Sequence, residues 1–315
     1  MTPSLSSHRN FGIDCLRGLA IPLVIVHHLA LPFRLPLGPS LLGEWLPKRL
    51  IDAISFNGYE AVFMFFAISG FLITLRIIER DGDIKQVDLR RFYRARARRI
   101  LPLLGLALVL LSVLAWCGVP GFAPESERQS LGGLLLSALT FTFNWYEGQT
   151  GWAPAGWDVL WSLSIEEVFY VGFPLLCLWL PRRMLIGVLL AWALGWSDIV
   201  YRQLFESNLY FICVGTGLLL LAFHAHPPAP VRGLRWLARM GSLSYELYLF
   251  HMFVVLAAVG LYRGMLGDVQ TWTFVVYLPV LLCSFALARL LERGTARLGL
   301  SGHTSWRRAS KENAV

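Results

Sequence analysis

The sequence predicts an all-α, polytopic bundle of transmembrane helices with about 8–10 spans. Its residues are 56% hydrophobic and only 15% charged, and its mean hydropathy is +0.57. A soluble domain carries roughly 25% charged residues, so this chain lacks the polar surface that water would require. Apolar stretches of roughly 20 residues, the length that crosses a bilayer, recur along the chain and leave no room for a separate soluble domain.

The spans follow from apolar runs that end at charged or turn-forming residues. We expect them at 12–33, 58–78, 100–118, 158–180, 184–200, 208–224, 241–262 and 270–289. Residues 12–289 would then form one transmembrane domain, between an N-terminal tail of residues 1–11 and a basic C-terminal tail of residues 290–315. The first run contains Asp14 and Arg17 and lacks a small-residue cleavage site, so we expect it to remain as a span.

The distribution of charge predicts the orientation of the chain and whether residues 131–146 cross the membrane. These residues form a short apolar segment with a glycine pair near its start. If this segment does not cross and the N-terminus is cytoplasmic, 21 Lys and Arg lie inside and six outside; if it crosses, 12 lie inside and 15 outside. The positive-inside rule favours the first arrangement. We therefore expect a multi-pass protein of the cell membrane with both termini cytoplasmic, and residues 131–146 re-entrant or at the outer interface.

Net charge and cysteine content argue against several other classes of protein. The net charge of +8 arises from Lys and Arg clustered in loops between spans, which favours membrane orientation over nucleic-acid binding. The five cysteines lie in apolar stretches without CxxC spacing. This pattern argues against a zinc site, a disulfide framework and a thiol nucleophile, and we expect no bound metal.

The first span contains ionisable residues, which inside a membrane are functional hypotheses by default. Arg17 and His28 are 11 residues apart. On a helix this spacing puts them on one face, with about 20° of residual rotation and about 16 Å between them. His27 is rotated about 80° away from Arg17, and Asp14 stands where it can pair with Arg17. The alternative is a polar stripe that binds neighbouring helices.

The span at 158–180 contains the segment WSLSIEEVFY, with two adjacent acids, Glu166 and Glu167. Ser162, Glu166 and Tyr170 share one helical face at i, i+4, i+8 spacing. Two neighbouring carboxyl groups in a low dielectric are not both ionised without partners, so we expect one to be protonated or to pair with Arg17 or a histidine. On the expected topology His28 and Glu166 lie at a similar depth. A packing role is the alternative.

Residues 88–102 form a basic, helix-like stretch on the expected cytoplasmic side, with Arg91, Arg94 and Arg98 along one face. The stretch either sets topology by contacting anionic lipid or binds the phosphates of a cytoplasmic donor, and both are compatible. Ser69 and Gly70 allow close helix approach. His251 is a mid-span histidine, either functional or hydrogen-bonded in the core.

Five segments, in order, resemble the acyltransferase-3 family of membrane acyltransferases. IDCLRGLAIPLVIVHH resembles its LRGLA segment with an Arg-x10-His pattern at Arg17 and His28. GYEAVFMFFAISGFLIT resembles its FFVLSGFLI span, RFYRARARRILP its RRxRRILP stretch, WSLSIEEVFY its WSLSVEEQFY element, and GSLSYELYLFH its ISYSLYLWH segment. Phe63 stands where the family often has an acid, and the nearest acid is Glu60.

The resemblance implies transfer of an acyl group, often acetyl, from cytoplasmic acyl-CoA to a hydroxyl group. Acyl-CoA would be a co-substrate, with no permanently bound cofactor, and the acceptor a cell-surface carbohydrate, a glycolipid precursor or a macrolide-type small molecule. His28 would act as general base, or alternatively as a covalent acyl carrier. Arg17 would hold the donor or stabilise the oxyanion, and Glu166 or Glu167 would orient His28 or bind the acceptor.

The remaining predicted contacts divide between donor and acceptor. The donor side comprises Arg91, Arg94, Arg98 and Ser69, and the acceptor side comprises Trp161, Ser162, Tyr170 and His251. Two other functions stay open: a transporter or exporter of a lipid-linked or anionic substrate, and a scaffold in a polysaccharide assembly complex. The internal repeats of many transporters are not visible in this sequence.

Overall fold

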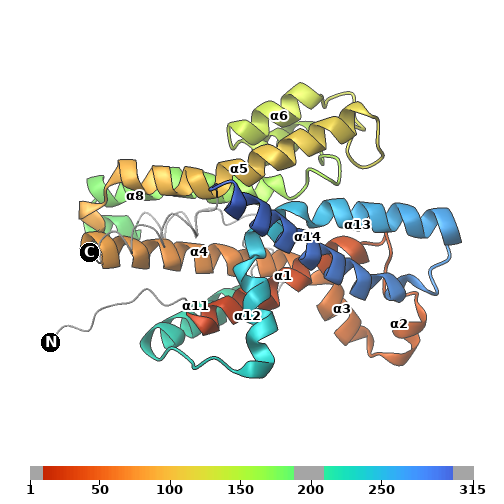
Figure 1. Ribbon diagram of the computed structural model, residues 1–315, viewed down its shortest axis with the longest axis horizontal. Coiled ribbons are helices and arrows are strands. Elements are labelled where there is room, and N and C mark those ends of the chain that lie inside the picture. The colour runs from red at the N-terminus through yellow and green to blue at the C-terminus, as the bar shows by residue number, and fades with distance from the viewer. Residues whose placement is uncertain (1–9, 188–208, 301–315) are drawn as a thin grey trace. The chain divides into compact units, whose positions relative to one another are not determined.

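A computed structural model describes residues 10–187 and 209–300 (Figure 1). The described residues form helices and no β-strand, which confirms the predicted all-α class. The helices are α1 (Phe11–Ala30), α2 (Leu41–Trp45), α3 (Lys48–Phe56), α4 (Gly58–Asp81), α5 (Leu89–Trp116), α6 (Leu131–Leu139), α7 (Phe143–Thr150), α8 (Leu160–Trp179), α11 (Leu209–Ala225), α12 (Arg235–Ser242), α13 (Ser244–Leu266) and α14 (Tyr277–Arg297). Three short 3-10 helices are η1 (Ile84–Gln86), η2 (Arg232–Leu234) and η3 (Thr273–Val276).

Six helices in the described part of the chain are long and apolar enough to cross a membrane: α1, α4, α5, α8, α13, and α14 together with η3. Each matches an expected span. The span expected at 208–224 coincides with α11, a helix of 17 residues. Most of the span expected at 184–200 lies outside the described residues. The chain is therefore a polytopic helical membrane protein.

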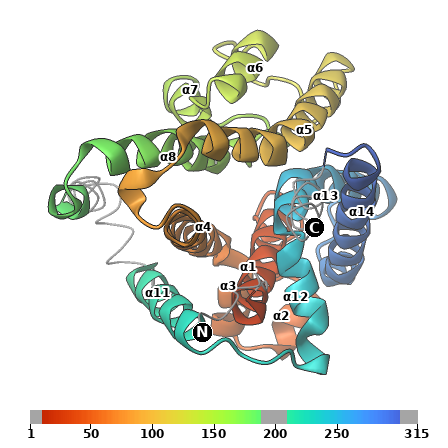
Figure 2. The same ribbon diagram turned by 60° about the vertical axis from the view of Figure 1, so that its left-hand side comes forward.

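Residues 131–146 do not form one continuous helix. They divide into α6 and α7, which pack against each other (Figure 2) and are separated by a turn in which Phe141 has a φ of 57°. The Tyr146 hydroxyl accepts the Ser130 N–H, and a Cβ at Gly133 would lie 2.6 Å from that hydroxyl. With nine and eight residues, neither helix reaches the roughly 20 residues of a crossing, as the charge distribution predicts.

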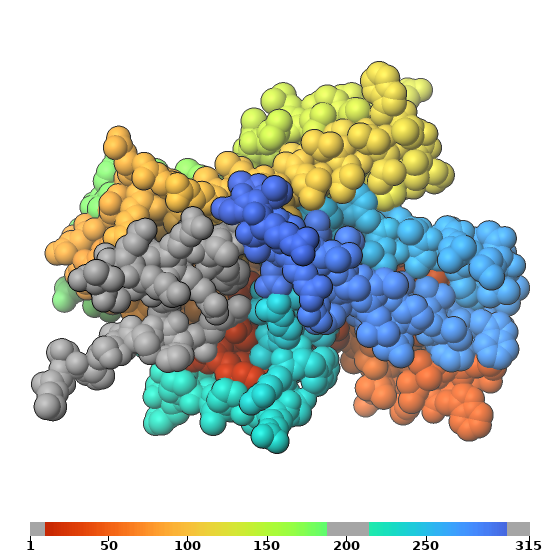
Figure 3. Space-filling model, viewed as in Figure 1, coloured from red at the N-terminus to blue at the C-terminus, as the bar shows by residue number. Residues whose placement is uncertain are grey.

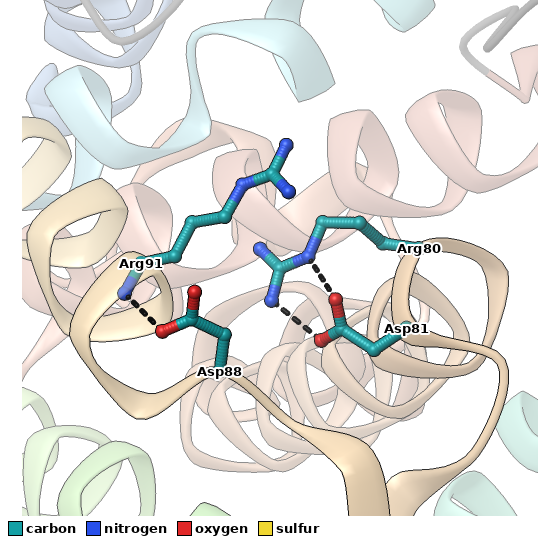
Figure 4. A network of polar contacts seen from close by, with 4 residues as sticks. All are labelled: Arg80, Asp81, Asp88 and Arg91. Atoms are coloured by element: carbon teal, nitrogen blue, oxygen red, sulfur yellow. Dashed lines mark hydrogen bonds and ion pairs between the residues drawn. The ribbon is translucent and has the colours of Figure 1, made fainter.

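The helix α5 begins well before residue 100, where the sequence suggested its span would start. The basic stretch, which the sequence indicated as helix-like, is thus the first part of the helix that contains the span expected at 100–118. The helix has an N-terminal cap, because the Asp88 carboxylate accepts the N–H of Arg91 at 3.0 Å. Just before it, Arg80 donates two hydrogen bonds to the Asp81 carboxylate, at 2.8 and 2.7 Å (Figure 4).

The chain divides into two compact units. The first contains the described residues of Met1–Ile73, Trp196–Tyr245 and Gln270–Phe274. In this unit α12 crosses α1 at glycines: a Cβ at Gly18 would lie 2.0 Å from the Leu237 carbonyl oxygen, and one at Gly241 would lie 1.8 Å from the Asp14 carbonyl oxygen. Only glycine permits so close a crossing. A small core joins α1 to α4 and α11 through Ile13, Leu16, Ile68 and Leu220.

The second unit contains α5–α8, α13 and α14. In it α8 packs against α5 and α7, and the side chains of α5 (yellow) and α6 (yellow-green) are in contact in Figure 3. The connection from α5 to α8 is held by polar contacts. Trp157 Nε1–H donates to the Phe122 carbonyl at 2.9 Å, and the Gln129 amide donates to the carbonyls of Gly151 and Trp152 at 3.0 and 2.8 Å. These hydrogen bonds hold the connection that precedes α8.

Candidate active site

The predicted site residues are divided between the two units. The first unit holds Arg17, His28 and Ser69. The second holds the rest: Arg91, Arg94, Arg98, Trp161, Ser162, Glu166, Glu167, Tyr170 and His251. The predicted match in depth between His28 and Glu166 concerns residues of different units, and it stays a prediction.

His28 lies in the last turn of α1 and is buried. Its carbonyl oxygen accepts a hydrogen bond from the guanidinium group of Arg34. The neighbouring His27 is held differently, because its Nδ1 lies 3.1 Å from the Ser55 carbonyl oxygen and its Cβ lies against Gly58, where an added Cβ would come within 2.3 Å. The rings of His27 and His28 lie 5.7 Å apart, edge to face, and the prediction that His28 rather than His27 acts with Arg17 stays a prediction.

Arg17 lies on the same continuous helix as His28, two turns after the N-cap at Asn10, whose side chain accepts the N–H groups of Gly12 and Ile13. Its turn of α1 is the one that packs against α12. Ser69 follows Ile68 in α4, at the core shared with α1. That position fits close helix packing, and the contact of Ser69 with a donor stays a prediction.

Glu166 and Glu167 have different environments although they are adjacent in sequence. The Tyr170 hydroxyl donates to the Glu166 carboxylate, and the Arg96 guanidinium lies 4.2 Å from the centroid of the Tyr170 ring. Glu167 is buried, and no described residue donates a hydrogen bond to its Oε1. The positive charges close to this pair come from α5, from Arg96 and Arg99. The predicted pairing of one of these acids with Arg17 or a histidine stays a prediction.

The basic part of α5 has two faces. Arg91, Arg94 and Arg98 are all exposed, as their predicted common face requires. Arg96 is rotated about 200° from Arg98 and turns toward α8. Arginine forks on the exposed face suit phosphate oxygens, whether of a lipid headgroup or of a soluble donor.

The start of α8 is connected to α13 by a pair of hydroxyl groups. Ser162 is buried and its Oγ is hydrogen-bonded to the hydroxyl of Tyr248. His251, one turn further along α13, is buried, and its Nδ1 lies 2.8 and 3.1 Å from the carbonyl oxygens of Tyr248 and Leu247. This geometry fits the hydrogen-bonded core histidine that the sequence left open. Trp161 is partly buried beside Ser162.

Three residues at these sites, Arg96, Tyr248 and Arg34, were not predicted from the sequence. Arg96 was detectable, since the wheel that aligned Arg91, Arg94 and Arg98 puts it on the other side. Tyr248 lies within a segment that was already singled out, three residues before His251. Arg34 gave no signal, because the charge count treats it as an ordinary external loop residue.

Comparison with known proteins shows that the chain matches a protein family. A family model described as "Acyltransferase domain", of the acyltransferase-3 type, matches residues 10–205. O-acetyltransferase OatA of Staphylococcus aureus (strain NCTC 8325 / PS 47) is 27% identical over 180 residues, which are 55% of this chain and 25% of that protein. A provisionally named O-acetyltransferase, SACOL0978 of Staphylococcus aureus (strain COL), is 25% identical over 317 residues, which cover 90% of this chain and 45% of that protein. The chain thus spans less than half the length of these relatives, and no solved structure matches it.

Proposed function

Because the chain belongs to the acyltransferase-3 family of membrane acyltransferases, we propose that it transfers an acetyl group from cytoplasmic acetyl-CoA to a hydroxyl group of a cell-surface carbohydrate or glycolipid precursor. The observation that carries the proposal is the family match over residues 10–205, which includes His28, the basic part of α5 and the Glu166–Tyr170 pair. The relatives that are named O-acetyltransferases support the choice of acetyl.

In the proposed reaction His28 acts as general base. Its imidazole takes the proton of the acceptor hydroxyl, whose oxygen forms a bond to the thioester carbonyl carbon. The carbon–sulfur bond then breaks, and the imidazolium returns the proton to the leaving thiolate, giving an ester and CoA. Arg17 would stabilise the negative oxygen of the tetrahedral intermediate. An acyl-imidazole on His28 is the covalent variant of the same scheme.

The donor and the acceptor would use different contacts. The exposed face of α5 would bind the CoA phosphates through Arg91, Arg94 and Arg98, and Ser69 would contact the donor arm. The acceptor would be bound from α8 and α13, by residues that include Trp161, Ser162, Tyr170 and His251. Glu166 or Glu167 would bind the acceptor or orient His28. No permanently bound cofactor is required, since acetyl-CoA is consumed as a co-substrate.

We propose the cell membrane as the location, with both termini cytoplasmic. Positions 125 and 235 are both exposed and should face opposite sides. An impermeant thiol reagent applied to intact cells should label a Glu125→Cys variant and leave an Arg235→Cys variant unlabelled. Labelling of position 125 only from the cytoplasmic face would contradict the topology.

Radiolabelled acetyl-CoA tests the activity directly. Inverted membrane vesicles that contain the protein expose its cytoplasmic face to the donor and retain the native acceptor. We expect release of CoA together with labelling of an alkali-labile ester in the glycan or glycolipid fraction. Vesicles in which acetyl-CoA stays intact would refute the enzyme and favour the transporter or the scaffold.

A further inference from the structure

Arg34 is buried although it lies in a connection between helices. It stands four residues after the end of α1 and is only 7% exposed. An arginine is always charged and is rarely buried, because a guanidinium removed from water must be paired or hydrogen-bonded. The burial of Arg34 therefore points to a specific contact.

The guanidinium group contacts the backbone of His28 and lies 5.1 Å from the centroid of the Phe33 ring. The helix α1 ends at Ala30, so the carbonyl groups of residues 27–30 have no partner within the helix. The Leu35 N–H donates to the Leu29 carbonyl at 3.1 Å, and the Arg34 guanidinium donates to the His28 carbonyl. A cation at this end also complements the helix dipole. Arg34 thus closes the last turn of α1 at the residue that carries the proposed base.

The connection that presents Arg34 is itself held in place. The Arg34 N–H donates to the Leu31 carbonyl at 2.8 Å, and the neighbouring Leu35 is buried. Further along, the Pro36 carbonyl accepts the Thr273 hydroxyl at 2.7 Å. The guanidinium is therefore offered from an ordered loop, so its hydrogen bond fixes the helix end.

We propose that Arg34 is a positioning residue for His28. It would hold the last turn of α1 so that the imidazole meets the acceptor hydroxyl in reactive geometry, while touching no substrate itself. The inference rests on the proposed function, in which His28 is the general base. A displacement of about 1 Å at a reacting group can cost about 100-fold in rate, which sets the scale of the expected effect.

The test compares Arg34→Met, Arg34→Gln and Arg34→Lys in the full-length protein, with CoA release from acetyl-CoA in inverted vesicles as the readout. We expect Arg34→Met to lower kcat about 10- to 100-fold per folded protein with KM for acetyl-CoA unchanged. Arg34→Lys and Arg34→Gln keep a donor and should recover part of the rate. Arg49→Met is the matched control, because Arg49 is an exposed arginine of α3 in the same unit.

A second comparison separates positioning from general stability. In a His28→Ala background, Arg34→Met should cause no further loss of the residual rate, because the group that Arg34 positions is gone. Should Arg34→Met not accumulate, Arg34→Gln replaces it in this comparison. With an active parent, two results overturn this inference alone. In the first, the Arg34 variants keep the parental kcat. In the second, Arg34→Met lowers the rate as much in the His28→Ala background as in the parent. A parent that releases no CoA overturns the proposed function and this inference together. A parent that works fully without His28 overturns the role of His28 as base, and this inference with it.

Discussion

The carboxyl group of Glu147 should make the folded protein less stable as the pH rises from about 4.5 to about 7. Glu147 lies in α7, outside the membrane-spanning helices. Its pKa is raised from the ordinary 4.5 to about 7, chiefly by burial and also by the nearby Asp158 carboxylate, while a hydrogen bond from the Ala153 N–H, 3.0 Å from Oε1, acts in the opposite direction.

The sign and size of the effect follow from this pKa. Below pH 4.5 the carboxyl group is protonated in both the folded and the unfolded chain. As the pH rises toward 7, only the unfolded chain loses its proton, so the free energy of unfolding falls until the folded carboxyl group ionises as well. At 1.36 kcal/mol per pKa unit, the total loss is at most about 3 kcal/mol.

The substitution Glu147→Gln removes the titration while keeping an oxygen that can accept the Ala153 N–H. Thermal unfolding in detergent at pH 5 and pH 8 compares the parent, this variant and Glu127→Gln, an exposed acid on the same connection. We expect Glu147→Gln to gain up to about 3 kcal/mol over the parent at pH 8 relative to pH 5, and Glu127→Gln to gain nothing. Parallel pH dependence in the parent and in Glu147→Gln would refute the reasoning.

Three further predictions concern the base, the donor and the packing of α1. His28→Ala should lower transfer by a factor of about 10² to 10⁴ while acetyl-CoA binding persists, and His27→Ala should be milder in the same assay; the opposite order would show that His27 is the base. Replacing Arg91, Arg94 and Arg98 of α5 together by Gln should weaken acyl-CoA binding, most at low salt. An unchanged affinity in equilibrium binding would leave these arginines as a topology signal. Gly241→Ala should destabilise the fold by roughly 1–3 kcal/mol or more through overpacking against α1, whereas Gly264→Ala, with open space around it, should not; equal unfolding temperatures would contradict the close crossing.

Hydrophobic runs predicted the membrane-spanning helices because the backbone N–H and C=O groups of each run must form hydrogen bonds within its own helix, whatever its neighbours are. The same local rule made residues 131–146 doubtful, and α6 and α7 show why: the segment is interrupted at Phe141. Hydropathy marks where the span in α5 becomes apolar, near residue 100. The helix itself begins at the Asp88 cap, within the polar part.

The sequence by itself determined the class of protein, the order of its spans and the common helix of Arg17 and His28, since these depend on composition and on spacing along one segment. Only the tertiary structure decided the partners of each polar group. Arg96 lies over Tyr170, and Arg34 closes the turn of His28. Such contacts depend on how helices and ordered loops pack, and a buried charge selects its partner from what that packing brings within reach.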